Sequence, residues 1–211
     1  MSQATSRREL RRQQHAELSR TQLLDAAEEV FGAKGFHDTT LKEVAELAEF
    51  SVGSVYSFFA NKDDLFLQVF LRRGDELLPA MEAVASSDDP PLDQLRELVE
   101  LEVGFFRQHR HFARLYLRSS ASTSLPPTPV YDGFKANFER AMGLQADVFR
   151  RGQELGALRD GDPYVLARML SGIVATFQLL DPATGSDDAA PGGGMPLDDL
   201  HEIVAGAFRR P

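Results

Sequence analysis

The amino-acid sequence predicts an all-α protein in which a small amino-terminal helix-turn-helix domain precedes a larger helical bundle. Apolar residues recur every three or four positions through most of the chain, and capping signals divide its first third into short helices. No segment shows convincing β-strand alternation. We expect a flexible basic arm over residues 1–18, the helix-turn-helix domain over residues 19–62 and the bundle over residues 63–211.

The first helix is expected from Ser19 to Lys34. Ser19 can cap its amino terminus, with Gln22 reaching back as in a capping box. Gly35 then follows as a residue that ends a helix at little cost in the left-handed conformation. The apolar face has helical spacing and consists of Leu23, Leu24, Ala27, Val30 and Phe31.

Two short helices and a long one follow. Thr40 and Glu43 form a second capping box, which begins a helix of about two turns. Ser51 can cap a third helix, from Val52 to Phe58, and Asn61 a fourth.

Two short helices joined by a tight turn are the layout of a DNA recognition unit, in which the first helix crosses the backbone and the second enters the major groove. Spacing alone fits an ordinary piece of helical bundle equally well, because helix-turn-helix geometry is common in proteins that never meet DNA. The identities of the residues are needed to separate these interpretations.

A set of residues spread over the three short helices and their caps is specific as a set, although no single member is. The set consists of Ala26, Ala27, Phe31, Lys34, Gly35, Phe36, Thr39, Thr40, Val44, Ala45, Ala48, Ser51, Gly53, Tyr56, Phe59, Lys62 and Leu65. On these residues the chain resembles the amino-terminal domain of the TetR/AcrR family of one-component regulators. The resemblance implies an all-helical homodimer with two recognition helices, a carboxy-terminal ligand-binding bundle and, usually, repression released by a small molecule.

The resemblance also implies roles for single residues. Thr40 matches a backbone contact at the start of the second helix, and Tyr56 and Lys62 match phosphate contacts after the recognition helix. A hydroxyl, a phenol and an ammonium are suitable phosphate donors, although Tyr56 could instead be a half-buried core aromatic. The expected recognition face consists of Val52, Gly53, Ser54 and Ser57, and the capping residue Ser51 is also expected to bind DNA.

Two departures from the family pattern bear on this face. The turn between the second and third helices usually carries alanine-glycine, whereas this chain has Ala48-Glu49. A position that often requires positive φ therefore holds a side chain that tolerates it poorly. The face also lacks Arg, Asn and Gln, which make bidentate contacts to base edges. We therefore expect thymine methyl contacts, serine hydroxyls and DNA shape to carry more of the specificity.

Charge is distributed unevenly. The chain has 23 basic and 32 acidic residues and a net charge of −9, which argues against nonspecific nucleic-acid binding over the whole surface. Basic side chains gather ahead of the first helix, chiefly Arg7, Arg8, Arg11 and Arg12. We expect this arm to lie along or in the minor groove of double-stranded DNA and to attract phosphate. A solvated, disordered tail is the alternative.

Several classes of site lack sequence support. The chain has no cysteine and no glycine-rich phosphate loop or zinc-protease motif, so neither a catalytic site nor a cofactor is expected. His109 and His111 flank Arg110 without further ligands, and no metal is expected there. The amino terminus is not a secretory signal and no run of about 18 apolar residues is evident, so we expect a cytoplasmic protein.

The rest of the chain predicts more helices. The fourth is expected to reach about Val84, with a kink or early end at Pro79. Loops at residues 86–91, 119–129 and 181–195 separate the later helices, which are expected over residues 92–108, from Phe112, over 130–155, over 162–180 and over 197–209.

The helix at residues 162–180 is apolar on more than one face. The family dimerises through its last two long helices, which accounts for this surplus; simple core packing is the alternative. The expected interface residues are Leu166, Leu170, Ile173, Phe177, Leu200, Val204 and Phe208.

The middle of the bundle is rich in Phe and Met, which suits an apolar effector pocket, although such stripes also form plain core. Glu102, His109 and Gln145 interrupt apolar stripes and need partners, which could be a ligand, protein or water. The expected ligand-binding residues are Glu102, Phe105, Phe106, His109, Tyr116, Phe134, Phe138, Met142, Gln145 and Phe177.

Together these expectations describe a repressor released by a small apolar or aromatic effector, which would push the fourth helix and change the separation of the two recognition helices. The alternative is a helical ligand-binding or scaffold protein that keeps the fold without binding DNA specifically.

Overall fold

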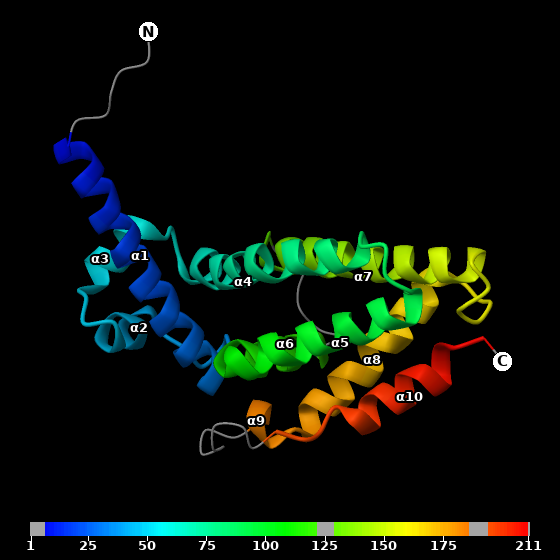
Figure 1. The fold of residues 1–211 in the computed structure, drawn as a ribbon. Coiled ribbons are helices and arrows are strands. Elements are labelled where there is room, and N and C mark those ends of the chain that lie inside the picture. The colour runs from blue at the N-terminus through cyan, green and yellow to red at the C-terminus, as the bar shows by residue number, and fades with distance from the viewer. Residues whose placement is uncertain (1–6, 122–128, 186–193, 211) are drawn as a thin grey trace, which may run out of the picture.

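The computed structural model describes residues 7–121, 129–185 and 194–210, and within these ranges the chain is all-α (Figure 1). The helices, in chain order, are α1 (Arg7–Lys34), α2 (Leu41–Leu47), α3 (Val52–Phe58), α4 (Lys62–Ala85), α5 (Pro91–Gln108), α6 (Arg110–Ala121), α7 (Pro129–Glu154), α8 (Pro163–Leu180), α9 (Pro182–Gly185) and α10 (Asp198–Phe208).

Helix α1 begins 12 residues earlier than expected, at Arg7, so the prediction that Ser19 caps it is wrong. Ser19 lies inside the helix and is buried. The stretch from Arg7 to Leu18 contains Arg, Glu, Gln, Leu and Ala, which are good helix formers, and no Gly or Pro to stop the helix. From Arg7 onward the arm is therefore an exposed helical extension rather than a flexible coil.

The capping predictions for the next three helices are confirmed. Thr40 accepts from the backbone N–H of Glu43, whose side chain returns to the Thr40 N–H, so both halves of the capping box are present. Ser51 accepts from the Ser54 N–H and Asn61 from the Asp64 N–H. These side chains satisfy backbone donors that each helix start would otherwise leave unpaired.

Glu49 carries the backbone strain that the sequence predicts. Its φ is +60°, and it is the one non-glycine residue of the described ranges with positive φ. The turn uses this conformation because the Phe50 N–H then donates to the Ala45 carbonyl at 2.8 Å, closing α2 before α3 begins.

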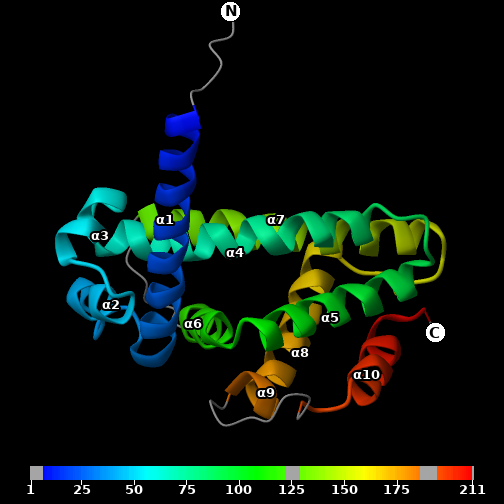
Figure 2. The ribbon, with the colours of Figure 1, turned by 60° about the vertical axis from the view of Figure 1, so that its left-hand side comes forward.

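The larger part of the chain is a bundle built on α4. Helices α4 and α7 run side by side, α5 and α6 lie in a second layer, and α8 crosses behind them with α10 outside it (Figures 1 and 2). Helix α4 runs through Pro79 to Ala85, which agrees with the expected end near Val84 and excludes an early end at the proline. The contact between α4 and α7 is the most extensive one between two helices, which offsets the backbone hydrogen bond that proline cannot make.

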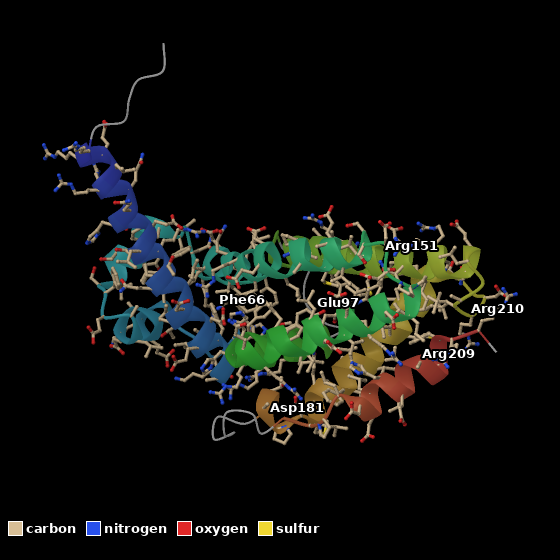
Figure 3. All side chains as sticks on the ribbon, in the orientation of Figure 1. Phe66, Glu97, Arg151, Asp181, Arg209 and Arg210 are labelled. Carbon is tan, nitrogen blue, oxygen red and sulfur yellow. The ribbon has the colours of Figure 1, made fainter. Side chains whose placement is uncertain are left out.

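The helix-turn-helix domain shares its hydrophobic core with the bundle. Phe31 of α1, Phe66 and Phe70 of α4, and Phe106 and Phe112 of α5 and α6 are buried in one cluster. Phe66 is labelled at the junction with α1 in Figure 3, and its ring meets that of Phe31 edge-on, with centroids 5.0 Å apart. The two domains are therefore joined by packed side chains as well as by the chain.

The boundaries of the later helices agree with the sequence to within a few residues, and Asp162 caps α8 as expected. The stretch expected as a loop after α8 differs, because Pro182–Gly185 forms a short helix. Buried Asp181 accepts from Arg107 Nε at 2.7 Å and from the Met195 N–H at 3.0 Å, which fixes both ends of this segment to α5.

Helix α8 is largely apolar, although Arg168 and Gln178 lie within it. By length and composition alone, Pro163–Leu180 would suffice to cross a membrane, and only 28% of it is buried within the chain. Its inner face packs in the core through Leu166, Leu170 and Val174, while Val165, Met169 and other apolar side chains remain exposed.

Replacing Glu49 by glycine is expected to stabilise the protein by about 1 kcal/mol, because glycine adopts positive φ without the steric cost that a Cβ adds. Chemical denaturation monitored by circular dichroism would measure this. Glu29→Gly, at an exposed position inside α1, is the matched control and should destabilise by about 1 kcal/mol. A loss of stability in Glu49→Gly would show that the turn is not strained.

Candidate DNA-binding surface and effector cavity

Helix α3 presents a polar and aromatic face to solvent. Val55 and the C-cap Phe59 point inward and are fully buried, whereas Val52, Gly53, Tyr56 and Ser57 are exposed. Tyr56 is 57% exposed, so it is not a half-buried core aromatic. The residues expected on a recognition face therefore lie on one accessible surface.

The serine hydroxyls on this surface are engaged locally. Ser51 Oγ lies 2.8 Å from Ser54 Oγ, and Ser57 Oγ donates to the Ser54 carbonyl at 2.6 Å. These bonds fix the rotamers of the three side chains and leave oxygen lone pairs facing outward.

Thr40, at the start of α2, is exposed, but its backbone N–H and its hydroxyl both donate to Glu43 Oε2 at 2.9 Å. Glu43 also pairs with Lys34. The hydrogen bond from Lys34 and those from Thr40 lower the pKa of Glu43 to about 2, so this carboxylate stays charged near neutral pH. Any phosphate contact by the Thr40 hydroxyl has to compete with this capping bond.

Lys62 has a structural role in place of the free phosphate contact expected from the sequence. Its Nζ donates to the carbonyls of Phe36 and Thr39 at 2.9 Å and of His37 at 3.3 Å, and it lies 4.4 Å from the centre of the Phe36 ring. An ammonium has three N–H donors, and all three are used here. Lys62 therefore ties the start of α4 to the loop after α1.

The arginines of the amino-terminal extension are exposed. Arg7, Arg8, Arg11 and Arg12 occupy positions i, i+1, i+4 and i+5, which lie on one side of a helix. The first turns of α1 project beyond the other helices (Figures 1 and 2). The extension therefore carries a concentrated positive charge away from the body of the molecule.

A cavity lies between α4, α5, α6, α7 and α8. Its volume is about 60 Å³, far below the roughly 300 Å³ or more of a site for a drug-sized ligand. Its walls are mostly apolar and consist of Phe70, Arg73, Gly74, Leu77, Leu78, Met81, Glu102, Phe106, Phe112, Tyr116, Asn137, Phe138, Ala141, Met142 and Ser171.

Glu102 is the acidic group of this cavity. Its Oε1 accepts from Gln145 Nε2 at 2.6 Å, and Gln145 is itself fully buried, with its Oε1 unpaired. Burial raises the pKa of Glu102 to about 7, against which the hydrogen bond from Gln145 acts only in part. Burial likewise raises the pKa of the Tyr116 phenol, so that group is neutral.

The cavity brings together half of the expected ligand-binding residues: Glu102, Phe106, Tyr116, Phe138 and Met142. Gln145 lies behind Glu102 as its partner. Phe105 packs on His109 away from the cavity, so the two are not lining residues. The side chain of Phe134 lies outside the described residues.

His109 is the C-cap residue of α5 and does not line the cavity with Glu102. Its Nε2 lies 3.6 Å from Glu76, and burial, followed by the charge of Arg73, lowers its pKa. No group of three or more His, Asp or Glu side chains suited to a metal ion occurs among the described residues.

Sequence reasoning missed part of the cavity wall. Phe70 and Phe112 were not among the expected ligand-binding residues, because nothing in the pattern distinguishes a core phenylalanine from one that faces a void. Arg73 and Asn137 are polar residues on amphipathic helices, where a solvent-facing position is the default expectation.

Arg73 connects the cavity to the helix-turn-helix domain. Its Nε and Nη2 donate to Glu28 of α1 at 2.8 and 3.1 Å, and its Nη1 donates to Glu76 at 2.6 Å. Arg72 also donates to Glu28, at 2.8 Å. Glu28 is only 5% exposed, so α1 is held to the cavity-lining helix by a buried carboxylate with two guanidinium partners.

The expected interface residues need correction. Leu166, Leu170, Leu200, Val204 and Phe208 are buried in the chain's own core. The periodicity showed that α8 and α10 are apolar on several faces but could not show which face the chain itself covers. Phe177 and Ile173 are partly buried and line a groove of about 580 Å³ between α8 and α10.

Known proteins share the helix-turn-helix domain and the helical bundle described above. Residues 23–69, from the middle of α1 to α4, match the model of the bacterial regulatory proteins of the tetR family. The helix-turn-helix domain of this chain is a TetR-family domain. The family consists of DNA-binding transcription regulators and not of enzymes, and its helix-turn-helix domain is the one described above.

Similar proteins extend the comparison beyond this domain. YfiR of Bacillus subtilis, an uncharacterized HTH-type transcriptional regulator, is 33% identical over 90 residues, which are 40% of this chain and 44% of YfiR. The chain thus matches less than half the length of that relative. The solved structure of the ketosteroid regulator KstR2 of Mycobacterium tuberculosis has a TM-score of 0.70 at 22% identity, covering 91% of this chain and 95% of KstR2.

The structure of FadR of Bacillus subtilis, solved in complex with stearoyl-CoA, has a TM-score of 0.71 at 17% identity and covers 88% of this chain and 95% of FadR. At such identities these structures establish a shared fold across both domains.

Glu102→Gln is expected to change how stability depends on pH. Because the pKa of Glu102 is raised from 4.5 to about 7 in the folded protein, its contribution to stability falls as pH rises from about 4.5 through 7. Glutamine cannot ionise, so the variant should gain stability over the wild type as pH rises to 8. Denaturant unfolding at pH 5 and pH 8 measures the difference between the two proteins, and an equal difference at both pH values would contradict the shift.

Proposed function

We propose that this protein is a cytoplasmic, homodimeric transcriptional repressor of the TetR family that binds an operator through α3 and is released by a small effector in the cavity between α4 and α8. The observation that carries this proposal is the exposed α3 face. A helix capped by Ser51 and held inward by Val55 presents Val52, Gly53 and Tyr56 to solvent.

The chemistry of this face favours shape and methyl recognition. Val52 can contact thymine methyl groups, and Gly53 lets the backbone approach the duplex, since even an added Cβ there would meet only Ser51 Oγ, at 3.7 Å. Tyr56 can donate to a phosphate. Without Arg, Asn or Gln on the face, part of the specificity has to come from DNA deformability.

The arginine extension supplies attraction to phosphate. A helix about 10 Å wide does not enter a minor groove about 6 Å wide, so the expectation that the arm lies in that groove gives way to contact with the phosphate backbone beside it. The four guanidinium groups are exposed and share one side of α1, which suits such a contact.

The connection between effector and DNA runs through α4. Arg73 lines the cavity and also binds Glu28 on α1, so an effector that displaces Arg73 acts directly on the helix that carries the DNA-binding domain. Operator half-sites one helical turn apart tolerate little change in the separation of two recognition helices. An effector that prefers the altered geometry therefore lowers operator occupancy.

The partner subunit of the proposed homodimer packs on the exposed apolar face of α8 and α10. Val165, Met169, Gly172, Thr176 and Leu179 are exposed and follow heptad spacing along α8. Ile203 of α10 is exposed and lines the groove, and Gly206 is exposed three residues further along the helix. A Cβ added at Gly172 or Gly206 would meet nothing of this chain, which leaves room for a close approach of helices from the partner.

The effector is expected to be apolar or aromatic and small. The cavity of about 60 Å³ favours a molecule much smaller than the stearoyl-CoA in the FadR structure. Five aromatic side chains in the wall provide the apolar contacts.

Fluorescence anisotropy against DNA from the region upstream of its own gene tests the proposed function, with unrelated DNA as the control. Tight, salt-dependent and sequence-selective binding supports the regulator. If a selection from random DNA also yields no specific site, the protein is instead a helical ligand-binding or scaffold protein.

Replacing Arg8 and Arg11 together by alanine is expected to weaken operator binding and to reduce the slope of log K against log salt by about 2, because each phosphate contact contributes roughly 0.9. Anisotropy at four salt concentrations measures the slope. Arg150→Ala, which removes an exposed arginine from α7, is the control and should leave it unchanged. An unaltered slope in the double variant would mean that the extension is only a solvated tail.

Met169→Glu is expected to convert the dimer into a monomer, because it places a charge in the middle of the apolar stripe on α8, where Met169 is 52% exposed. Light scattering at micromolar concentration measures the mass. Leu155→Glu, at an apolar position after α7 that is 67% exposed, is the control and should remain dimeric. If the wild-type protein is already a monomer at this concentration, the proposed homodimer is wrong.

A further inference from the structure

The cavity between α4 and α8 has a shortage of hydrogen-bond donors. Glu102 has one hydrogen bond among the described residues, from Gln145 to its Oε1, and its side chain remains partly accessible from the cavity. Gln145 Oε1 is buried and has no partner among the described residues. A buried acceptor of this kind is costly unless something donates to it, and Glu102 Oε2 likewise receives no hydrogen bond from the described residues.

Two arginines lie nearest the cavity, and neither is directed at Glu102. Arg73 lines the wall, but its nitrogens are bound to Glu28 and Glu76, so two carboxylates face this one guanidinium. Arg168 of α8 lies over the Phe138 ring, with its guanidinium carbon 4.8 Å from the centroid. Neither arginine pairs with Glu102.

The remaining titratable group is the phenol of Tyr116 from α6, which stays neutral because burial raises its pKa. The polar group that α7 contributes behind Glu102 is the uncharged Gln145. The cavity thus contains one carboxyl group without a counter-ion, and an anionic ligand would add a second negative charge beside it.

The other walls suit a cation as well. Phe70, Phe106, Phe112 and Tyr116 form a connected cluster, with centroids of Phe106 and Phe112 5.8 Å apart and those of Phe106 and Tyr116 5.1 Å apart. Aromatic faces attract organic cations and also contact alkyl groups. Glu102 stands among these rings as the single anionic partner.

We infer that this cavity binds a compact organic cation, such as a short-chain primary amine, with the ammonium group donating to Glu102 and the carbon chain lying against the aromatic wall. The inference rests on the proposed function and specifies the effector as an amine rather than an acid or acyl thioester. The volume of about 60 Å³ restricts it to a few carbon atoms unless side chains move.

The protonation state of Glu102 provides a second measurement of amine binding. Its pKa of about 7 leaves the carboxyl group about half protonated at pH 7 in the free protein. An ammonium beside it stabilises the charged form, so the group loses its proton when the amine binds. Binding at pH 7 should therefore release about half a proton per amine.

Calorimetric titration of the full-length protein with n-butylamine hydrochloride tests this, with 1-butanol and sodium butyrate as neutral and anionic probes of similar size at equal ionic strength. We expect the amine to bind roughly tenfold or more tightly than the alcohol, since a hydrogen bond to a charged group is the stronger kind, and butyrate not to bind. Repeating the titration in two buffers of different ionisation enthalpy measures the released proton.

Three variants locate the effect. Glu102→Gln keeps the shape of the side chain and should lose both the preference for the amine and the proton release, while its melting temperature shows that it is folded. Glu102→Asp keeps the charge and should retain part of both. Glu97→Gln removes an exposed carboxylate from the same helix (labelled in Figure 3) and should bind the amine as the wild type does.

Equal or tighter binding of butanol or butyrate, or unchanged amine binding in Glu102→Gln, overturns the inference. Operator binding measured in the same samples separates it from the proposed function. An amine that binds through Glu102 without changing operator affinity supports this site while removing the effector from the repressor mechanism. Operator binding without any amine binding rejects the site alone.

Discussion

The buried carboxylate of Glu28 is the interaction on which the arrangement of the two domains depends. It lies on α1, and both of its guanidinium partners, Arg72 and Arg73, lie on α4. Removing one partner of a buried ion pair generally costs about 3–5 kcal/mol, because the charge that remains is left unpaired in a poorly hydrated place. This network therefore fixes one angle between α1 and α4, and the direction in which α3 is presented follows from that angle.

The same helix serves both chemistries of the molecule. Along α4, Phe66 and the arginine pair meet α1, while Phe70 and Leu77 form part of the cavity wall, and Arg73 takes part in both contacts. Because protein interiors are packed as closely as organic crystals, a ligand that enlarges the small cavity has to move the wall. The DNA-binding domain has no separate core to absorb that movement, since its aromatic cluster continues into α5 and α6.

The local signals in the sequence predicted the local structure well. Capping by Thr40, Ser51 and Asn61 and the positive φ at Glu49 follow from interactions over three or four residues, which the sequence displays directly. The start of α1 was predicted too late in the chain, because a serine such as Ser19 can be an N-cap residue or a buried residue inside a helix, and the sequence does not distinguish the two. The exposed face of α8 and the lining of the cavity depend on which side of a helix other elements cover, and single-chain periodicity does not contain that information. Lys62 was misread for the same reason, since its three carbonyl partners lie more than 20 residues away.

The contact between Gly32 and α6 limits how regulators of this design can be recombined. A Cβ at position 32 would lie 2.5 Å from the backbone oxygen of His111, and Arg118 donates to the carbonyl of Gly32 itself. Main chain thus packs on main chain, and no choice of rotamer can relieve a larger residue there. A chimera that takes its DNA-reading half from one protein and its sensing half from another would have to preserve a glycine at this crossing, together with the first turn of α6. The segments to exchange in such a chimera are therefore set by the contact between α1 and α6, and not by the choice of a junction in the linker between α3 and α4.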